Sequence, residues 1–261
     1  MEPNRDITVE RDGHLLMIGV NRPGKKNSFT PEMLNALGRA YAQLENDDDL
    51  RCGVLFAHGS NFTAGLDLTL FAERFAEGRL LDAEGGIDPF RLSEPYLTKP
   101  VVTAIQGLCL TAGIELMLAT DVRIASDDAR FAQIEVRRGF FAAGGATIRF
   151  VQEAGWGNAM RWLLTGDEFS AAEALRIGFV QEVVETSKQL DRAVEIARVI
   201  ADRAPLAVRA TKRLAHLAVL RGFDEGASRL MPDLRPVMET EDAGEGVLSF
   251  IERRKANFKG R

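Results

Sequence analysis

Short apolar runs alternate with polar turns and amphipathic stretches along the first half of the chain, as is typical of strands joined by helices. The runs predicted to form strands are residues 7–9, 15–20, 54–57, 101–105 and 122–125. Asp12 and Gly13, between the first two runs, indicate a hairpin turn. The later strands are separated by helical stretches, and this rhythm favours parallel pairing in an α/β fold.

Apolar residues at helical spacing predict one long helix early in the chain and several more in its second half. The early helix is expected to begin at Thr30 and Pro31, because Thr is a favoured N-cap and Pro suits the first turn. Shorter helices are expected after Asp67, a possible cap, and over residues 114–119. The later predicted helices are residues 146–154, 158–164, 170–176, 188–203, 205–221 and 242–256.

The change from mixed α/β pattern to helical pattern divides the chain in two. We expect a core that contains the active site over residues 1–200, and a helical C-terminal region over residues 201–261. Residues 79–96 interrupt the core pattern with two adjacent glycines and two prolines. This stretch is predicted to be a mobile or inserted segment.

Composition and charge narrow the class of protein. Of the 261 residues, 46% are apolar and 27% charged, which is ordinary for a globular protein. The net charge of −5 and the pI of about 5.4 show that the whole chain lacks the excess of basic residues that nucleic-acid binding needs. Nucleic acid is therefore not an expected partner. The basic residues near the C-terminus, at 253–255, 259 and 261, could meet an anionic ligand, although a solvated helix end is the simpler interpretation.

The apolar runs and the cysteines bear on where the protein works. Gly, Glu or Asp breaks every apolar run well short of the roughly 20 residues that a membrane span needs. Residues 1–9 are charged and lack the apolar segment of a secretory signal. Cys52 and Cys109 lie in no CxxC or His-rich pattern, which indicates neither a disulfide framework nor a zinc site. We therefore expect a cytoplasmic protein with no membrane partner.

Two turns between a strand and a helix are candidates for chemistry. One contains Gly65, and the other spans residues 107–113. A helix start leaves backbone N–H groups free, and two such sets could converge on one oxygen as an oxyanion hole requires. The glycine spacing matches neither a dinucleotide fingerprint nor a P-loop, and no G-x-S-x-G nucleophile motif occurs.

Two glutamates follow apolar stretches and are candidates for proton transfer. Glu115 stands in the first turn of an apolar helix, where a carboxylate needs either a partner or a raised pKa. A structural ion pair with Arg123 or Arg137 and an acid–base role are both open at this point. Glu135 is a candidate because it can act together with Glu115. Two carboxyl groups around one site can divide the acid and base roles.

Several ordered motifs carry a resemblance to a known family. They are Phe62-Thr63-Ala64-Gly65-Leu66-Asp67-Leu68, Gly113-Ile114-Glu115-Leu116, Ala119-Thr120-Asp121-Val122-Arg123-Ile124-Ala125 and Phe131-Ala132-Gln133-Ile134-Glu135, with Asn21-Arg22-Pro23 before them and Leu164-Thr165-Gly166 after. From about residue 7 to the C-terminus the chain resembles the crotonase, or enoyl-CoA hydratase, superfamily. The resemblance implies a crotonase-like spiral of ββα units, with a helical C-terminal region that builds homotrimers, often paired into hexamers.

The resemblance also implies an acyl-CoA thioester as partner and assigns residues to it. Family members need no metal or redox cofactor, and coenzyme A is part of their substrate. By motif position, Glu115 and Glu135 are the catalytic acids, and the backbone N–H groups of Leu66 and Ala112 hold the thioester oxygen. The positions implied to contact CoA are Lys25, Lys26, Ala64 and Lys259, the last of these from a neighbouring subunit.

Because both glutamates are present, the resemblance favours hydration of the C2–C3 double bond of a 2-enoyl-CoA, with Glu115 as base and Glu135 as acid. Two positions depart from the family pattern. Ala112 replaces a frequent Gly, and residues 140–145 read Phe-Phe-Ala-Ala-Gly-Gly where a Pro-Gly-rich stretch is usual. Isomerisation, hydrolysis or decarboxylation of an acyl-CoA, or non-catalytic acyl-CoA binding, are therefore the alternatives.

Overall fold

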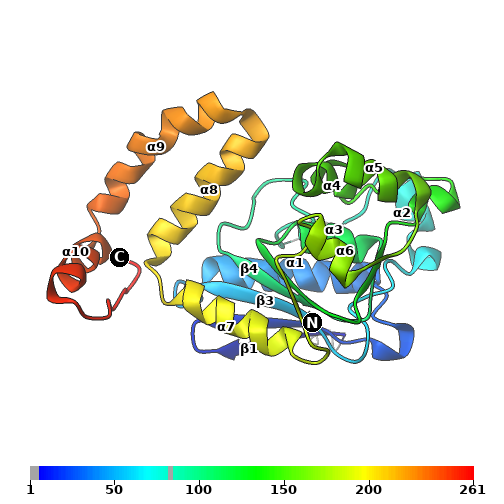
Figure 1. The fold of residues 1–261 in the computed structure, drawn as a ribbon, viewed down its shortest axis with the longest axis horizontal. Coiled ribbons are helices and arrows are strands. Elements are labelled where there is room, and N and C mark those ends of the chain that lie inside the picture. Colours follow the sequence, from blue (N-terminus) through cyan, green and yellow to red (C-terminus); the bar gives the residue numbers. More distant parts are fainter. Residues whose placement is uncertain (1–5, 82–84) are drawn as a thin grey trace.

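A computed structural model describes residues 6–81 and 85–261, and its larger sheet has six strands in the order β1-β2-β3-β4-β6-β9 (Figure 1). These strands are β1 (Ile7–Asp12), β2 (Leu15–Val20), β3 (Cys52–Ala57), β4 (Val101–Ile105), β6 (Val122–Ser126) and β9 (Glu182–Val184). β1 and β2 form the predicted hairpin, and every other neighbouring pair is parallel. Parallel pairing places the chain after each strand at the same edge of the sheet.

A second, smaller sheet was not predicted, because its strands are too short to show a period. It contains β5 (Leu108–Leu110), β7 (Arg130–Ala132) and β8 (Phe169–Ser170), in the order β5-β7-β8. A single bridge between Thr63 and Cys109 adds the segment after β3 to this sheet. The chain therefore repeats one path three times: a strand in the larger sheet, a short extended stretch in the smaller one, and then helical residues.

Helices connect these turns and form the C-terminal part. They are α1 (Pro31–Asn46), α2 (Ala72–Ala76), α3 (Ala112–Leu118), α4 (Ala146–Ala154), α5 (Trp156–Thr165), α6 (Ala171–Arg176), α7 (Gln189–Ala201), α8 (Pro205–Arg221), α9 (Phe223–Met238) and α10 (Glu241–Glu252), with 3-10 turns η1 (Pro23–Lys25), η2 (Leu68–Leu70) and η3 (Glu135–Arg138). Thr30 caps α1 as predicted, accepting from the Met33 amide at 3.3 Å. Asp67 caps nothing and instead pairs with Arg22 at 3.2 Å.

Helix α9 was not predicted, and α10 is shorter than predicted. Prolines at 232 and 236 lie inside α9. Because proline ordinarily breaks a helix, the sequence pattern did not indicate a helix there. α10 ends at Glu252 because Arg253 adopts a left-handed conformation, with φ of 53°. The chain then turns back, and the Asn257 amide donates to the Glu245 carboxylate at 2.8 Å.

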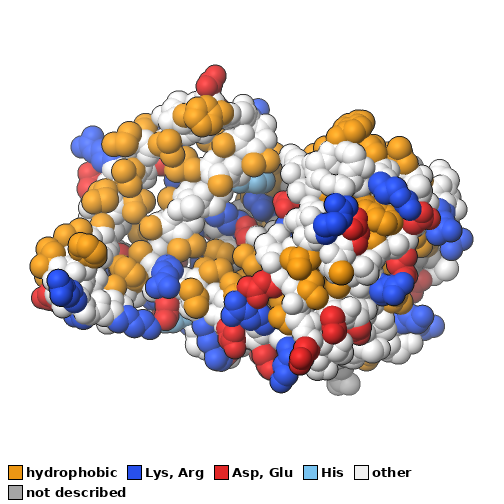
Figure 2. All heavy atoms as spheres, in the orientation of Figure 1, with side chains coloured by type: hydrophobic (Ala, Val, Ile, Leu, Met, Phe, Trp, Pro, Cys, Tyr) orange, Lys and Arg blue, Asp and Glu red, His pale blue; other side chains and the backbone are white. Residues whose placement is uncertain are grey.

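Helices α8, α9 and α10 stand apart from the two sheets (Figure 1). Large apolar side chains are exposed along all three, and many of the orange atoms in Figure 2 lie there. They include Val219, Leu220, Phe223, Leu230, Met231, Met238, Val247, Phe250 and Ile251. Over the described ranges, no helix combines the length and apolar character needed to cross a membrane.

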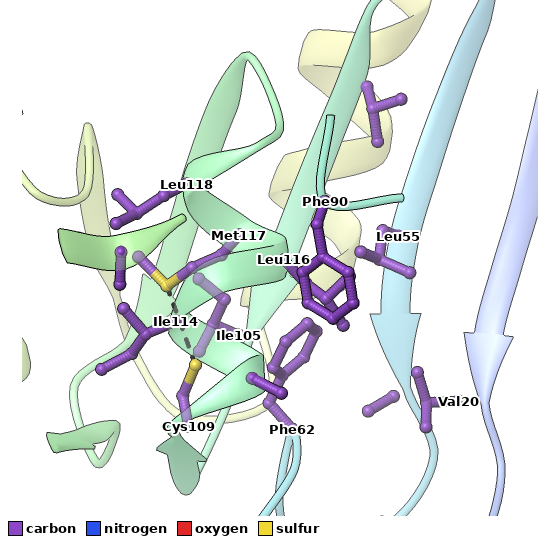
Figure 3. Packing of buried hydrophobic residues seen from close by; sticks show 14 of the residues in the cluster. Val20, Leu55, Phe62, Phe90, Ile105, Cys109, Ile114, Leu116, Met117 and Leu118 are labelled. Carbon is purple, nitrogen blue, oxygen red and sulfur yellow. Dashed lines mark hydrogen bonds between the residues drawn. The ribbon is translucent and has the colours of Figure 1, made fainter. Parts of the chain in front are cut away.

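The core surrounds α3 on one side of the larger sheet, while α7 covers the other side. Figure 3 shows Ile114, Leu116 and Met117 of α3 packed among Phe62 and Phe90 from neighbouring segments. Each is 0% exposed, and burying a side chain of this size contributes roughly 1.5–3 kcal/mol. The helix that carries Glu115 is therefore held rigidly from several directions.

The segment predicted to be mobile or inserted is packed where the structure describes it. Ile87 and Phe90 belong to the buried core, and residues 82–84 lie outside the described residues. The Asp88 carboxylate accepts from the amides of Phe90 at 2.8 Å, Leu92 at 2.9 Å and Ser93 at 3.1 Å. The glycines and prolines therefore shape an ordered turn, which sequence pattern alone cannot distinguish from a flexible one.

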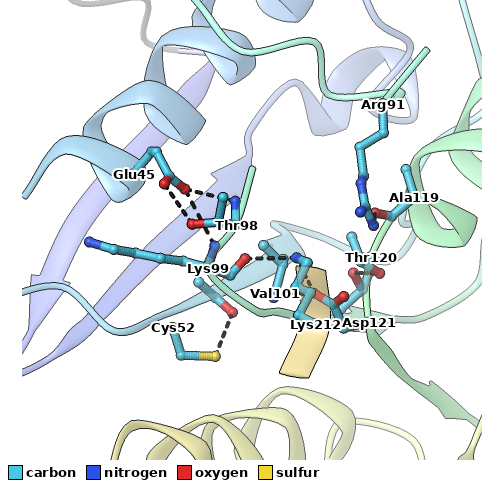
Figure 4. Close-up of polar contacts among 12 residues, drawn as sticks. Glu45, Cys52, Arg91, Thr98, Lys99, Val101, Ala119, Thr120, Asp121 and Lys212 are labelled. Carbon is cyan, nitrogen blue, oxygen red and sulfur yellow. Dashed lines mark hydrogen bonds and ion pairs between the residues drawn. The ribbon is translucent and has the colours of Figure 1, made fainter. Parts of the chain in front are cut away.

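Polar contacts join α8 to the core (Figure 4). The Lys212 ammonium contacts the Asp121 carboxylate at 2.7 Å and the Lys99 carbonyl at 2.8 Å. The Arg209 guanidinium donates to Glu45 and to Thr98, both at 2.8 Å. These contacts tie the first half of α8 to the segments that precede β4 and β6, while the division of the chain near residue 200 stays a prediction.

Candidate active site

The loop after β3 is shaped by Gly65. Its φ of +98° is one that side chains rarely adopt, and a Cβ there would lie 1.9 Å from Thr111 Oγ1. Phe29 holds the loop from one side: its amide donates to the Gly65 carbonyl at 2.8 Å, and its carbonyl accepts from the Asp67 amide at 2.9 Å. These bonds flank Leu66, so the Leu66 N–H points away from Phe29.

The second predicted amide, that of Ala112, begins α3. Thr111, just before it, has φ 50° and ψ −115°, a conformation that costs free energy for a residue with a side chain. Its backbone is held on both sides, since its amide donates to Ala132 at 3.0 Å and its carbonyl accepts from Ile114 at 2.9 Å. The strain at Thr111 sets the direction of the Ala112 amide, and the sequence indicated only a turn of small residues there.

The backbone amides of Leu66 and Ala112 share one property. In the part of the chain that the structure describes, neither donates to a protein oxygen. Free amides are expected at the start of a helix, but Leu66 belongs to a loop whose neighbouring amides are bonded. Gly113, next to Ala112, lies so close to Thr63 that a Cβ would stand 2.4 Å from Thr63 Cγ2. That these two amides hold one oxygen stays a prediction.

Glu115 lies one helical turn after Ala112 and is 4% exposed. Its Oε1 accepts from the Ala146 amide at 3.3 Å. Gly144 also faces the carboxyl group, because a Cβ at that position would lie 2.4 Å from Oε2. Only a glycine leaves this oxygen room, and this role of Gly144 was not predicted from the sequence.

The structural alternative for Glu115 is wrong. Arg123 pairs with Glu153 at 2.6 Å, and Arg137 packs against Gly166. Within residues 6–81 and 85–261, no Lys or Arg forms an ion pair with Glu115. A buried carboxyl group without a cation favours its protonated form.

Glu135 begins η3 and is 7% exposed. The Gln133 side-chain amide donates to its Oε1 at 3.0 Å. Its Oε2 and the Gln133 side-chain oxygen are both buried, and neither has a hydrogen-bond partner. Unpaired buried oxygens are uncommon in folded proteins and are a mark of functional sites. Gln133 was visible only as part of the quoted motif, with no role assigned.

Burial raises the pKa of both carboxyl groups to about 7. For Glu115, desolvation is the main cause of the raised pKa, and the negative charge of Glu135 adds to it. The ionisation of Glu135 therefore affects that of Glu115. The amides of Ala146 and Gly144 and the charge of Arg149 act in the opposite direction on Glu115. Near neutral pH the pair therefore holds about one proton, which suits one acid and one base.

Three of the four predicted CoA contacts lie together, and the fourth does not. Lys25 and Lys26 are exposed at η1, and the Lys26 carbonyl accepts from the Ala64 amide at 2.9 Å, beside the Gly65 loop. Lys259 lies near Arg51, which donates to the neighbouring Phe258 carbonyl at 2.9 Å.

The position of Lys259 matters for its predicted role. Arg51 precedes β3 and Gly65 follows it, so the six residues of β3 separate Lys259 from the site by about 20 Å. Within one chain Lys259 does not reach the other three residues. A contact with the same CoA would have to come from a neighbouring copy, as the resemblance implied.

The unusual stretch at residues 140–145 begins beside Glu135. The Phe140 amide donates to the Glu135 carbonyl at 3.3 Å, and the Phe140 ring packs against Phe75 with centroids 6.4 Å apart. The rings of Phe140 and Phe141 are both exposed. The aromatic pair therefore lies at the surface beside Glu135 instead of filling the core.

Repeated strand–strand–helix turns define a spiral α/β protein, and its described residues include two buried carboxyl groups and two backbone amides without an acceptor. The sequence profile described as enoyl-CoA hydratase/isomerase matches residues 10–261. A solved structure described as a probable enoyl-CoA hydratase/isomerase from Mycobacterium abscessus superposes with a TM-score of 0.95. That chain is 48% identical, over 98% of this chain and 99% of the other.

Curated relatives agree in both length and description. A short-chain-enoyl-CoA hydratase from Clostridium acetobutylicum is 34% identical over 100% of both chains. An (E)-benzylidenesuccinyl-CoA hydratase from Thauera aromatica is 36% identical over 97% of this chain and 99% of the other. The chain belongs to the enoyl-CoA hydratase/isomerase family. The predicted crotonase-like fold and the family resemblance are thereby confirmed, while the roles of the individual site residues stay predictions.

Proposed function

We propose that this protein is a lyase that adds water across the C2–C3 double bond of 2-enoyl-CoA thioesters. The observation that carries the proposal is the pair of buried carboxyl groups, Glu115 and Glu135, beside the free amides of Leu66 and Ala112. The family and its hydratase members support the same reaction.

In the proposed mechanism the amides act on the thioester oxygen. As water attacks C3, the electrons of the double bond move toward C1 and leave negative charge on that oxygen. Donors aimed at such a charge in a dry site each contribute about 3–4 kcal/mol to the transition state. Leu66 and Ala112 have no other hydrogen bonds to break within the described chain, so this stabilisation costs little reorganisation.

The glutamates divide the two proton transfers. Ionised Glu115 accepts a proton from water as the water oxygen bonds to C3, and protonated Glu135 donates its proton to C2. Transfer of a proton from Glu115 to Glu135 then restores the starting state, so the sum is one added water. The reaction is redox-neutral, and we propose that it uses no metal or redox cofactor.

We also propose that the protein works as a homotrimer, alone or paired into a hexamer. The exposed apolar side chains of α8, α9 and α10 form a surface too large to suit a lone chain in water. Assembly through this region would also allow Lys259 of one copy to approach the CoA of another, since it lies too far from the site of its own chain.

Loss of the ultraviolet absorbance of crotonyl-CoA tests the proposed reaction directly. Glu115→Gln and Glu135→Gln should each lower kcat by about 10²- to 10⁴-fold, because each removes one proton transfer. Glu195→Gln on α7 is the matched control, since Glu195 is exposed and paired only with Arg192. Full activity in both site variants would contradict the assignment.

Product analysis separates the alternatives. Incubation with a panel of enoyl- and acyl-CoA esters should yield 3-hydroxyacyl-CoA. A shifted double bond would indicate an isomerase, free CoA a hydrolase, and loss of carbon dioxide a decarboxylase. Tight CoA binding without turnover of any panel member would indicate a binding protein.

A further inference from the structure

The two carboxyl groups of the candidate site need a means of dividing one proton between them. Burial raises the pKa of both Glu115 and Glu135 to about 7, so burial alone does not decide which of them holds the negative charge. The proposed hydration needs Glu115 ionised and Glu135 protonated. A fixed positive charge nearer to one carboxyl group than to the other would make this distinction.

A turn of two glycines separates Glu115 from such a charge. Gly144 leaves room for the Glu115 carboxyl group, as described above. Gly145 leaves room for Arg149 in the same way, because a Cβ at Gly145 would lie 2.3 Å from Arg149 Nη1. Adjacent Cα atoms are about 3.8 Å apart, so the carboxylate and the guanidinium approach neighbouring residues of one turn.

The Arg149 side chain is held in this place by backbone contacts. Its Nη2 donates to the Arg91 carbonyl at 3.0 Å. Arg91 in turn donates to the carbonyl of Ala119, the residue after α3, at 3.4 Å (Figure 4). Arg149 Nη1, the atom beside Gly145, is buried and has no hydrogen-bond partner in the described chain. The guanidinium is therefore fixed between α4 and the end of the helix that carries Glu115.

Charged and titratable groups from several elements surround Arg149. They are Arg91, Asp88 and Tyr96 of the segment before β4, Glu115 of α3, and His216 of α8. Across residues 6–81 and 85–261, Arg149 forms a direct ion pair with none of them. Burial and the neighbouring cations lower the pKa of His216 to about 4, so it is neutral at pH 7. The guanidinium itself stays charged at that pH.

Arg149 acts on one glutamate of the pair and not on the other. Its charge is among the groups that lower the pKa of Glu115, together with two backbone amides. For Glu135 the groups that lower the pKa are its own amide and the Gln133 side chain. A direct ion pair with an arginine would lower a carboxyl pKa by about 1–3 and weaken the base. A cation across the glycine turn favours the ionised form and still leaves a group that accepts a proton.

We propose that Arg149 is a positioning residue that directs the one negative charge of the carboxyl pair onto Glu115, across the turn formed by Gly144 and Gly145. The inference rests on the proposed hydration, in which Glu115 is the base and Glu135 the acid. Arg149 touches no reacting atom in this mechanism. It makes the two carboxyl groups unequal and so fixes which of them takes the proton from water.

The ionisation of Glu115 tests the proposal without turnover. In a Glu135→Gln background, carboxyl-carbon NMR of protein labelled at its glutamates follows Glu115, whose signal is the one that disappears in Glu115→Gln. Adding Arg149→Gln removes the charge but keeps a donor for the Arg91 carbonyl. It should move the midpoint of the Glu115 titration about one pH unit higher. Arg149→Lys keeps the charge and should move the midpoint less than half as far.

Kinetics of the otherwise unchanged enzyme supply a second measurement. If the relative pKa changes by one, the ratio of the two singly protonated forms changes tenfold, so Arg149→Gln should lower kcat for crotonyl-CoA about fivefold. KM should stay within about twofold, because Arg149 does not contact the substrate in this mechanism. Arg149→Lys should restore most of kcat. Arg176→Met is the matched control, since Arg176 is exposed and paired with Glu173, and it should change neither kcat nor the Glu115 midpoint.

Two results would overturn the proposal. One is an unchanged Glu115 midpoint in the neutral variants, for which Arg149→Met replaces Arg149→Gln if the latter does not fold. The other is an equal displacement in Arg149→Gln and Arg149→Lys, since a merely structural role does not depend on charge. If the wild type hydrates no enoyl-CoA, the proposed function fails, while the NMR midpoints still confirm or overturn the effect of Arg149 on Glu115.

Discussion

Glu115 and Glu135 keep a proton at pH values where exposed glutamates have lost it. The cause is burial, with a pKa of about 7 for each and no cation paired with Glu115 in the described chain. Exposed glutamates such as Glu195, which pairs with Arg192 at 2.9 Å, lack this burial. The chemistry is therefore a property of the surroundings of two residues.

The pH dependence of kcat/KM should be bell-shaped with a maximum near pH 7. The proposed mechanism needs one ionised and one protonated carboxyl group. Activity rises as the pair loses its first proton and falls as it loses the second. In Glu135→Gln the residual rate should rise at lower pH than in the wild type, because the charge that raises the pKa of Glu115 is gone. Rates measured from pH 5 to pH 9 check this, and a flat wild-type profile would contradict it.

At the scale of elements, two turns and one helix position the site. α3 is anchored by its buried apolar side chains, and the turn before it is strained at Thr111. The Gly65 loop is held between Phe29 and that turn. The position of the two amides thus depends on backbone conformations that only certain residues allow.

Gly65→Ala should lower kcat by about 10²- to 10³-fold, the effect of losing one oxyanion donor. The added methyl would collide with Thr111 and turn the Leu66 amide away. Gly155→Ala is the matched control, because Gly155 also has a positive φ, of +74°, but open space around it. It should cost about 1 kcal/mol of stability and leave activity within twofold. Crotonyl-CoA kinetics and chemical unfolding of both variants measure the difference.

At the scale of the whole molecule, the C-terminal helices and the site have opposite surface character. Glu115 and Glu135 are buried, whereas α9 and α10 expose side chains such as Phe223 and Phe250, which is 84% exposed. A lone chain would leave this apolar surface in water, which explains the proposed assembly.

Phe250→Glu should shift the protein to a lower molecular mass in size-exclusion chromatography with light scattering. A buried charge at the proposed interface would be unpaired and costly. Leu164→Glu on α5, another strongly exposed apolar position, should leave the mass unchanged. If Phe250→Glu keeps the wild-type mass, α10 does not belong to the interface.

Much of the fold was predictable because its signals are local. The hairpin at Asp12 and Gly13, the cap at Thr30 and the parallel strands follow from residue types and period. The short strands of the smaller sheet and the proline-containing α9 were missed, because three-residue strands have no period and prolines usually end a helix. Residues 79–96 were predicted to be a mobile or inserted segment, because the order of their described part comes from contacts such as those of Asp88 and not from a local pattern.

The sequence by itself determined the family, the fold class and the two glutamates as candidate acids, since these depend on motifs with fixed order and spacing. Only the tertiary structure decided that Glu115 has no cationic partner, that Gly144 faces its carboxyl group and that Lys259 lies far from the site of its own chain. It also decided that Arg149 lies against Gly145, next to the glycine that faces Glu115. Burial, pairing and pKa arise between residues distant in sequence, and no local pattern of residues encodes them.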